Sequence, residues 1–475
     1  MLWFTIITSI LLSLSGICYS DNPGMKIRIT GSALDKSVKY LMNNIISQEK
    51  EYQLPDVIGS TTVDNEPMKY EFKQIRLTSF YCPTISSKWV SGTGLQISMK
   101  DGSATINSTY SIDYWLVKDS ASSVLTLSEI SVSLVLGVHE GDPGMPSISL
   151  LDCQSTVQGI DVKLLSDVSY IYNDLQKSIQ NLVGTNINQQ ICAALRNSVN
   201  QWDQSLSHLN LNLSLNNLIG IDLSLVGNPE ITEQYADIGL KGLFYSINET
   251  GAAFAPTPML LPIKSRSMLY AGISEASGNS LFDAYYSTGS FYYEISHMAG
   301  SKNITTSELA ACIPEISQHF PTTAPVKIKV SATSSPNMYL HSNNMTIKFL
   351  GLIQTFAYPL NSEPQYLFSA KIVASFNANF SLSNAKDVPG LNLAGSISLI
   401  RLQMDKSPSD TKASKVVVTE DKVQKLLTEV VLPAVNEKIA QGMLIPGTFL
   451  VNPSINIKEG FALLAADMKE ESSKV

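Results

Sequence analysis

Two hydrophobic periodicities alternate along this chain, and each of them recurs in both halves. Residues 25–30 alternate apolar with polar side chains, as a half-buried strand does. Apolar side chains at three- and four-residue steps then predict an amphipathic helix whose stripe contains Leu34, Val38, Leu41 and Ile45. After this helix, the pattern over residues 58 to 155 returns to short alternating runs separated by Gly, Asp and Ser clusters, which indicates an antiparallel meander.

A long helical stripe follows this meander. The helical period over residues 162–206 places Leu175, Ile179 and Leu182 on one face, with an interruption near Gly184. An isolated helix of this length cannot hide such a stripe by itself. We therefore expect the helix to lie on a large apolar surface.

The second half repeats the same order of patterns. A strand at residues 268–273 leads into a helical pattern, and a β-rich run extends over residues 304–405. A last helix over residues 419–441 is expected to kink at Pro433. Its apolar stripe contains Leu426, Leu427 and Val430. Both halves thus follow the order strand, helix, meander, helix with little residue identity, which indicates a repeat of architecture; coincidence is the alternative.

The stretch between the two halves, residues 251–263, contains three prolines and five large apolar residues. Proline removes a backbone donor and fixes φ, so neither a helix nor a central strand can run through it. The stretch is also too apolar for a solvated linker. We expect an extended connector lying against the protein body, with Phe254 and either Leu260 or Leu261 mostly buried.

Domain boundaries follow from this organisation. We predict a signal peptide over residues 1–20, a first domain over 21–246, a proline-rich linker over 247–263 and a second domain over 264–475. The first segment is uncharged and mostly apolar, and it ends in small residues, which is typical of secretory signals. An uncleaved membrane anchor is the alternative, although the apolar run is short for a span. The predicted location is secreted and extracellular.

Composition and charge narrow the function classes. Charged residues make up 16% of the chain, against a usual value of about 25%. The net charge is −8, and it arises in the first half, because residues 21–246 hold 15 Lys+Arg against 23 Asp+Glu whereas residues 247–475 hold 18 of each. No basic block is present that would favour nucleic-acid binding.

Cysteines and glycosylation motifs agree with a secretory route. Four cysteines follow the predicted signal peptide, and none forms a zinc-type CxxC pair, so disulfides or free thiols are expected. Three pairings are possible. The chain also contains Asn-x-Ser/Thr glycosylation motifs in both halves. Their asparagines are Asn107, Asn212, Asn248, Asn303, Asn344 and Asn379.

No pattern in the sequence favours catalysis. The five histidines are scattered, and no metal-ligand spacing or Gly-rich phosphate loop occurs. The nearest approach to a Gly-x-Ser-x-Gly nucleophile motif, residues 272–276, lacks the final glycine. We predict no enzyme, no catalytic residues, no metal and no cofactor. The amphipathic stripes fit either a lipid pocket or a dense core, and periodicity alone favours the dense core.

Five segments, taken in order, carry a family resemblance. They are Asn22-Pro23-Gly24, Lys26 to Ile29 with Leu34-Asp35, Phe254-Ala255-Pro256, His319-Phe320-Pro321 leading to Val326–Ala332, and Val431 to Ile439. Together they resemble the bactericidal/permeability-increasing protein family, which includes lipopolysaccharide-binding protein and the plasma lipid transfer proteins. The likeness covers residues 22–467, nearly the whole chain after the predicted signal.

The resemblance implies an α+β fold. It is an elongated boomerang of two pseudo-symmetric barrels, each a twisted antiparallel sheet with two amphipathic helices, joined by a central sheet and the proline-rich linker. It also implies a disulfide between Cys153 and Cys192, with Cys82 and Cys312 as free thiols or intermolecular partners. Each barrel is expected to hold a phospholipid or other amphipathic lipid, with or without transfer of that lipid, against the three helical stripes described above.

The charge pattern departs from the family's antibacterial members, whose first-barrel tip is rich in Lys and Arg. The matching segments here, residues 56–64 and 112–119, contain a single basic residue, Lys118. The alternative function is an innate-immunity protein that binds lipopolysaccharide or a bacterial surface. Because phosphate capture depends on clustered cations, its charge-driven form is disfavoured. Trp115, Leu116 and Val117 are instead candidates for an apolar tip that enters a membrane; a strand edge packed inward is the alternative.

Overall fold

The computed structural model describes residues 22–469 except for gaps at 48–51, 54–55, 64–65, 115–116, 166–171, 249–252, 265, 301, 321, 386–389, 406–415 and 447–449. The chain forms two compact units. Unit 2 contains residues 29–209 and 228–237, and unit 1 contains residues 210–227, residues 238–475 and the segment before Ile29. Strands β1 (Met25–Thr30) and β12 (Tyr235–Leu240) each contain a boundary between the units. The division therefore assigns residues 210–227 and 238–246 to unit 1 rather than to the first domain expected from the sequence.

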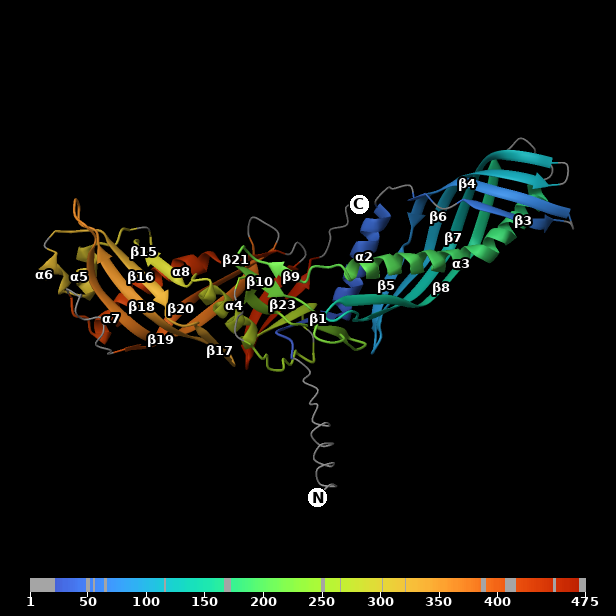
Figure 1. The fold of residues 1–475 in the computed structure, drawn as a ribbon. Helices are drawn as coiled ribbons and strands as arrows, with labels where there is room; N and C mark the ends of the chain where they lie inside the picture. Colours follow the sequence, from blue (N-terminus) through green and yellow to red (C-terminus); the bar gives the residue numbers. More distant parts are fainter. Residues whose placement is uncertain are drawn as a thin grey trace, which may run out of the picture. The chain divides into compact units, whose positions relative to one another are not determined.

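Unit 2 is built on a seven-stranded antiparallel sheet with the order β2-β4-β6-β7-β8, in which β3 also pairs with β4 and β5 with β6. The strands are β2 (Tyr52–Gln53), β3 (Val57–Val63), β4 (Glu66–Tyr81), β5 (Thr84–Val90), β6 (Gly94–Tyr114), β7 (Val117–Glu140) and β8 (Pro146–Leu165). Figure 1 shows helix α3 (Tyr172–Leu206) running along this sheet, and α2 (Gly31–Ser47) beside β5. A short strand, β11 (Glu230–Ile231), pairs with β12.

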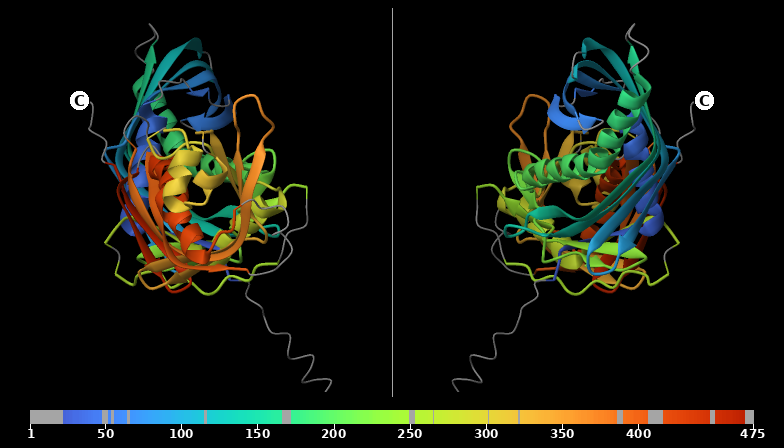
Figure 2. Two further views of the ribbon diagram at one scale, coloured as in Figure 1. Left: turned by 90° about the vertical axis from the view of Figure 1, so that its left-hand side faces the viewer. Right: turned by 90° about the vertical axis from the view of Figure 1, so that its right-hand side faces the viewer.

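The alternation in β7 explains which face of this sheet is buried. Ile130, Val132, Leu134 and Leu136 are all buried, whereas the residues between them are only half-buried. Register shifts occur in β4, β6 and β7, where Gln74, Asp101 and Glu129 adopt positive φ. Bulges of this kind bend a strand and increase its twist. They account for the curl of the sheet visible in Figure 2.

The long helix begins later than the sequence analysis expected. Residues 162–165 belong to β8, where Val162 pairs with Leu125 and is 3% exposed, and α3 starts at Tyr172. Val162 and Leu164 alternate as sheet residues do. A pattern of only four residues is too short to distinguish the two-residue repeat of a strand from the three- to four-residue repeat of a helix. The helix continues through Gly184 without the expected interruption. The unfavourable helix propensity of one glycine is small compared with the free energy that a long helix gains by packing.

Unit 1 contains a second seven-stranded antiparallel sheet with the order β15-β16-β18-β19-β20-β21, in which β17 also pairs with β18. The strands are β15 (Tyr292–Ile295), β16 (Val326–Ala332), β17 (Asn337–His341), β18 (Asn344–Ala357), β19 (Gln365–Asn384), β20 (Gly390–Met404) and β21 (Met443–Pro446). The unit also holds an antiparallel group of β14 (Leu269–Ser274), β23 (Phe461–Met468) and β22 (Leu450–Lys458). A three-stranded sheet orders β13 (Leu243–Ser246), β10 (Ile219–Asp222) and β9 (Asn212–Ser214).

Helices pack on these sheets in unit 1. They are α4 (Glu275–Ser287), α5 (Thr306–Cys312), α6 (Ile316–His319), α7 (Glu420–Leu426), the π-helical turn η2 (Leu427–Val431) and α8 (Leu432–Gln441). Helices α5 and α6 correct the expectation of a continuous β run over residues 304–405. A capping box between Thr305 and Glu308 starts α5 by satisfying free amides at its first turn. The motif Thr-x-x-Glu was present in the sequence as the signal for this helix.

The π-helical turn occurs where Pro433 was expected to kink the last helix. Proline has no amide hydrogen, and its ring clashes with the carbonyl four residues earlier, here that of Glu429. Residues Leu427–Val431 open into a π-helical turn, and Pro433 occupies the first turn of α8. A local π-helical turn is one of the known ways in which a helix accommodates such a disruption.

Candidate functional site

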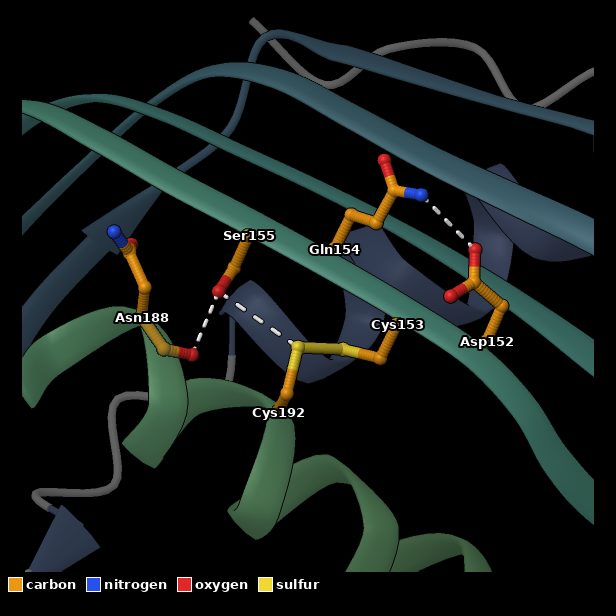
Figure 3. Close-up of a disulfide and its surroundings, with 6 residues drawn as sticks. All are labelled: Asp152, Cys153, Gln154, Ser155, Asn188 and Cys192. Atoms are coloured by element: carbon orange, nitrogen blue, oxygen red, sulfur yellow. Dashed lines mark hydrogen bonds between the residues drawn. A yellow bond between two sulfur atoms is a disulfide. The ribbon is translucent and has the colours of Figure 1, made fainter.

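A disulfide and a hydrogen bond, both drawn in Figure 3, join helix α3 to strand β8. Cys153 of β8 and Cys192 of α3 form a disulfide with a Cα–Cα distance of 5.8 Å. One helical turn earlier, the Ser155 hydroxyl donates to the backbone carbonyl of Asn188 at 2.8 Å. The helix is therefore fixed to the sheet covalently and by hydrogen bonding, so the face that it presents to the sheet is set.

Asp203 provides a further anchor at the C-terminal end of α3. Its Oδ1 accepts a hydrogen bond from the Ser147 hydroxyl at 2.7 Å and one from the Ile148 amide at 2.9 Å. These two bonds favour the ionised carboxylate, the Ser147 bond most, and they hold the pKa of Asp203 below its ordinary value. The start of β8 is thus joined to the last turns of α3.

Between these anchors, α3 presents an apolar face to the sheet. Val199 is 2% exposed and belongs to the core of unit 2 together with Ile130 and Leu134. Ile187, Ile191 and Leu195 pack against the same core but remain only half-buried. The expected lining residues Leu175, Ile179 and Leu182 lie in the part of α3 whose side chains are outside the described residues.

The expected apolar stripe of helix α2 is buried at Leu34 and Val38 and exposed at Leu41. Leu34 and Val38 are 7% and 8% exposed and pack with Ile85 and Trp89, whose indole Nε1 donates to the Ile29 carbonyl at 3.1 Å. Leu41, expected on the same buried stripe, is 57% exposed. It shares the helical spacing, but Met42, the next residue, packs against this cluster and Leu41 does not, so the buried face is displaced from the expected stripe. The side chain of Ile45 is outside the described residues.

The second set of expected lining residues is fully enclosed by protein. Leu426, Leu427 and Val430 are 0%, 2% and 2% exposed. They belong to a cluster that also contains Ile353 and Phe368, each 0% exposed. At these positions the dense-core interpretation describes the packing, because neighbouring side chains already cover each residue.

Three described lysines on the β6–β7 hairpin and its neighbouring strands are paired with carboxylates. Lys118 lies 3.2 Å from Asp113, and its side chain is 80% exposed. On neighbouring strands, the distances are 2.8 Å for Lys73 to Glu71 and 3.9 Å for Lys163 to Asp161. Trp115 and Leu116 and the side chain of Val117 lie outside the described residues, so the expected apolar tip stays a prediction. Ion pairs between exposed side chains, such as that of Lys118 with Asp113, are weak and are screened by salt.

The other two cysteines of the described residues are free and buried. Cys82 and Cys312 are 6% and 4% exposed. Burial raises the pKa of Cys82, and burial followed by the hydrogen bond to Glu429 raises the pKa of Cys312 to about 11. Buried thiols are not accessible to a second chain, so the folded protein offers neither of them for intermolecular pairing, the alternative that the resemblance left open.

The six sequon asparagines are all exposed. The predicted signal peptide lies outside the described residues. Within the described part of the chain, no helix is both long and apolar enough to cross a membrane. Across the same residues, His, Cys, Asp and Glu side chains form no group of three or more that is arranged to hold a metal ion.

The connector between the halves buries some of its apolar side chains and exposes others. Met259 and Leu261 are 2% and 7% exposed and pack with Phe461 of β23. The buried Arg28 guanidinium donates to the Pro262 carbonyl at 2.6 Å. Phe254 is half-buried, and Leu260 is 86% exposed. The expectation is therefore correct for Leu261 and only partly so for Phe254.

Comparison with known proteins covers almost the whole chain. The N-terminal domain model of the LBP / BPI / CETP family matches residues 33–209, and its C-terminal domain model matches residues 213–469. BPI fold-containing family C protein of Homo sapiens is 30% identical over 460 residues, which cover 95% of this chain and 90% of that protein. Bactericidal permeability-increasing protein of Sebastes schlegelii is 24% identical over 97% of this chain and 98% of its own length.

Two further matches concern lipopolysaccharide-binding proteins. That of Bos taurus is 22% identical over 477 residues, covering 98% of this chain and 97% of its own. A crystal structure of lipopolysaccharide binding protein superposes with a TM-score of 0.56 at 21% identity, covering 95% of this chain and 99% of that one. This structural match shows the fold: an α+β protein of two curved antiparallel barrels.

Proposed function

Because the chain belongs to the LBP / BPI / CETP family, we propose that it is a secreted lipid-binding protein and not an enzyme. Its cargo is a phospholipid or another amphipathic lipid whose acyl chains lie against apolar helix and sheet surfaces in each half. The observation that carries the proposal is the half-buried apolar face of α3, which the Cys153–Cys192 disulfide holds on a curved sheet. No cofactor or metal is needed for this role.

Energetics favour the first half as the main site. Ile187, Ile191 and Leu195 retain exposed apolar surface, and an acyl chain that covers it gains about 0.8 kcal/mol per buried CH₂ group. The described anchors already hold the helix, so little ordering entropy opposes binding. In the second half, the same proposal requires Leu426, Leu427 and Val430 to separate from their neighbours, because they are at most 2% exposed.

Extraction of the purified protein with organic solvent, followed by mass spectrometry of the extract, tests this function. We expect about one co-purified lipid or more per chain. Ile191→Asp places a charge on the apolar face of α3 and should reduce the lipid content at least about tenfold. Gln190→Asp, on the exposed side of the same helix, is the matched control and should keep the lipid. An extract without lipid from the wild-type protein would contradict the proposal.

Movement of cargo between membranes is a separate part of the proposal. Fluorescent phospholipid placed in donor vesicles should reach acceptor vesicles faster when the protein is added, and Ile191→Asp should abolish the acceleration. Lipid that co-purifies but is not exchanged would assign the protein to storage or recognition rather than transfer. No bound lipid and no exchange would instead indicate a structural protein with filled cores.

A second candidate function is recognition of lipopolysaccharide, which the name of the Bos taurus relative states for that protein. The paired cations Lys73, Lys118 and Lys163 argue against a charge-driven mode. Binding to lipid A vesicles should therefore change little as ionic strength rises from about 0.01 to about 0.15 M, over which the Debye length falls from about 30 to about 8 Å. Asp113→Asn, which releases Lys118, should increase binding at the lower ionic strength. Strong, salt-sensitive binding by the wild type would restore the electrostatic mode.

A further inference from the structure

Strand β9 is an edge strand, and one of its residues is a glycosylation acceptor. In the three-stranded sheet, β9 pairs with β10 through Leu213 and Ile221, and no other strand of the described residues pairs with its outer side. Exposed strand edges present unpaired amides and carbonyls, which invite pairing with another chain. All three residues of β9 are exposed, so this edge is open to such pairing.

The register shows which backbone groups face the open edge. Leu215 donates its amide to Ile219 at 2.9 Å, and Leu211 accepts from the Leu223 amide at 2.8 Å. Residues with odd numbers are therefore bonded to β10, and the backbone groups of Asn212 and Ser214 point away from it. The Asn212 amide is partly protected, because it donates to the Asn210 side-chain oxygen at 3.1 Å. Ser214 has no such local acceptor among the described hydrogen bonds.

Apolar side chains accompany this edge. Leu213 in β9, and Leu215 and Leu218 in the turn between β9 and β10, are 43%, 54% and 40% exposed. A second copy that paired with β9 would gain backbone hydrogen bonds and cover part of this surface, which makes self-association through the edge favourable in the absence of protection.

Asn212 is the acceptor of the sequon Asn212-Leu213-Ser214, which coincides with β9 itself. Of the six sequon asparagines, all of which the structure describes, the other three that lie in strands belong to strands with partners on both sides: Asn107 in β6, Asn344 in β18 and Asn379 in β19. Asn344 and Asn379 are themselves paired on one side, with His341 and Ser396. Asn212 differs because the whole outer side of its strand is unpaired within the described residues. Side chains of a strand point to the faces of the sheet, so a glycan on an inner strand projects from a face and covers no edge.

We propose that Asn212 carries an N-linked glycan that covers the open edge of β9 and prevents pairing of this edge with a second copy of the chain. In this step the anomeric carbon of the glycan bonds to the Asn212 Nδ2, which loses one proton, while the bond between that carbon and its lipid-linked diphosphate donor breaks and the lipid diphosphate leaves. Because the donor is supplied along the secretory route, the proposal rests on the secretory route proposed above. Its function is to keep the molecule from associating, and it is independent of lipid binding.

The test uses the full chain secreted from a eukaryotic cell line. Glycopeptide mass spectrometry measures the occupancy of each sequon, and light scattering after size-exclusion chromatography measures the mass over a range of concentrations. We expect Asn212 to be occupied. Asn212→Gln and Ser214→Ala, which both remove the sequon, should strengthen self-association at least about tenfold relative to the wild type.

Two further variants identify the edge as the cause. Ser214→Lys also removes the sequon but places a charge on the edge, and charged edges resist pairing; it should associate no more than the wild type. Asn344→Gln removes a sequon from a paired strand and should behave likewise. Thermal melting of each variant establishes that it is folded.

The outcomes separate this proposal from the secretory route. A chain that stays inside the cell and does not reach the medium would overturn both. A secreted protein without glycan at any sequon would overturn this proposal alone. Glycans at other sequons but not at Asn212 would overturn this proposal alone. So would unchanged association of folded Asn212→Gln and Ser214→Ala, or association of Ser214→Lys equal to that of Ser214→Ala.

Discussion

Helix α3 of unit 2 and the α7–η2–α8 segment of unit 1 both cover a curved antiparallel sheet, but different forces hold them. The second segment is held by packing: Val423 and Leu426 are 0% exposed within a large apolar cluster. Helix α3 is held by a disulfide and by the polar contacts of Asn188 and Asp203, while several of its apolar residues stay half-buried. Anchors other than apolar burial allow a helix to keep apolar surface available for a ligand.

The disulfide gives the largest expected difference between the two regions. The double variant Cys153→Ala, Cys192→Ala opens a loop whose ends are 39 residues apart, and the chain-entropy model assigns roughly 4 kcal/mol to such a cross-link. We expect that loss in unit 2 only. Native-state hydrogen exchange, which reports regions separately, should show faster exchange in α3 and an unchanged unit 1. Cys82→Ala is the control, and an equal effect in both variants would contradict the anchoring role.

Truncation of one leucine in each region tests the difference in packing. Leu426→Ala leaves a cavity in a closed core and should lower the free energy of unfolding of unit 1 by about 3 kcal/mol. Leu195→Ala removes a side chain that is already half-exposed, so unit 2 should lose only about 1 kcal/mol. Denaturant unfolding followed by hydrogen exchange measures both. Equal losses would mean that α3 is as tightly packed as α7.

Asp203→Asn should destabilise unit 2 by about 1–2 kcal/mol at neutral pH, because it weakens two charge-assisted hydrogen bonds. The folded-state pKa of Asp203 is depressed from its ordinary value of 3.8. Its stabilisation is therefore fully present above pH 3.8 and is lost as pH falls through the lower folded-state pKa. Urea unfolding of both proteins should show a difference at neutral pH that shrinks only in strong acid. If the difference in unfolding free energy disappears already near neutral pH, a titratable group other than Asp203 causes it.

The two free thiols give the smallest expected effect and the most direct comparison of accessibility. At about pH 8, a pKa of about 11 leaves Cys312 with roughly 100-fold less thiolate than a thiol at the ordinary value of 9.0. Alkylation of native protein, followed by peptide mass spectrometry, should label Cys82 before Cys312. In denaturant both should react at the same rate. Earlier labelling of Cys312 would show that unit 1 opens more readily than unit 2.

Strong periodicities predicted most of the elements. The alternating runs expected over residues 58–155 contain β7, and most of the helical period expected over residues 162–206 corresponds to α3. Weak or short signals failed: residues 162–165 are strand rather than helix, and α5 and α6 interrupt the second β run. A four-residue apolar pattern fits either period, so pairing with β7 decided the first case. The Thr305 and Glu308 capping box was readable for the second.

The sequence by itself determined the broad order of the elements, because this depends on local period, and the family, because this depends on motif order; the family resemblance in turn implied the Cys153–Cys192 pair. Only the tertiary structure decided which apolar residues are covered. Helical spacing cannot separate a buried position from an open one, as Val38 at 8% and Leu41 at 57% exposure show on one helix. Leu260 and Leu261 make the same point, since adjacent side chains on an extended chain point to opposite sides. Burial depends on what lies opposite, and that partner comes from distant parts of the chain.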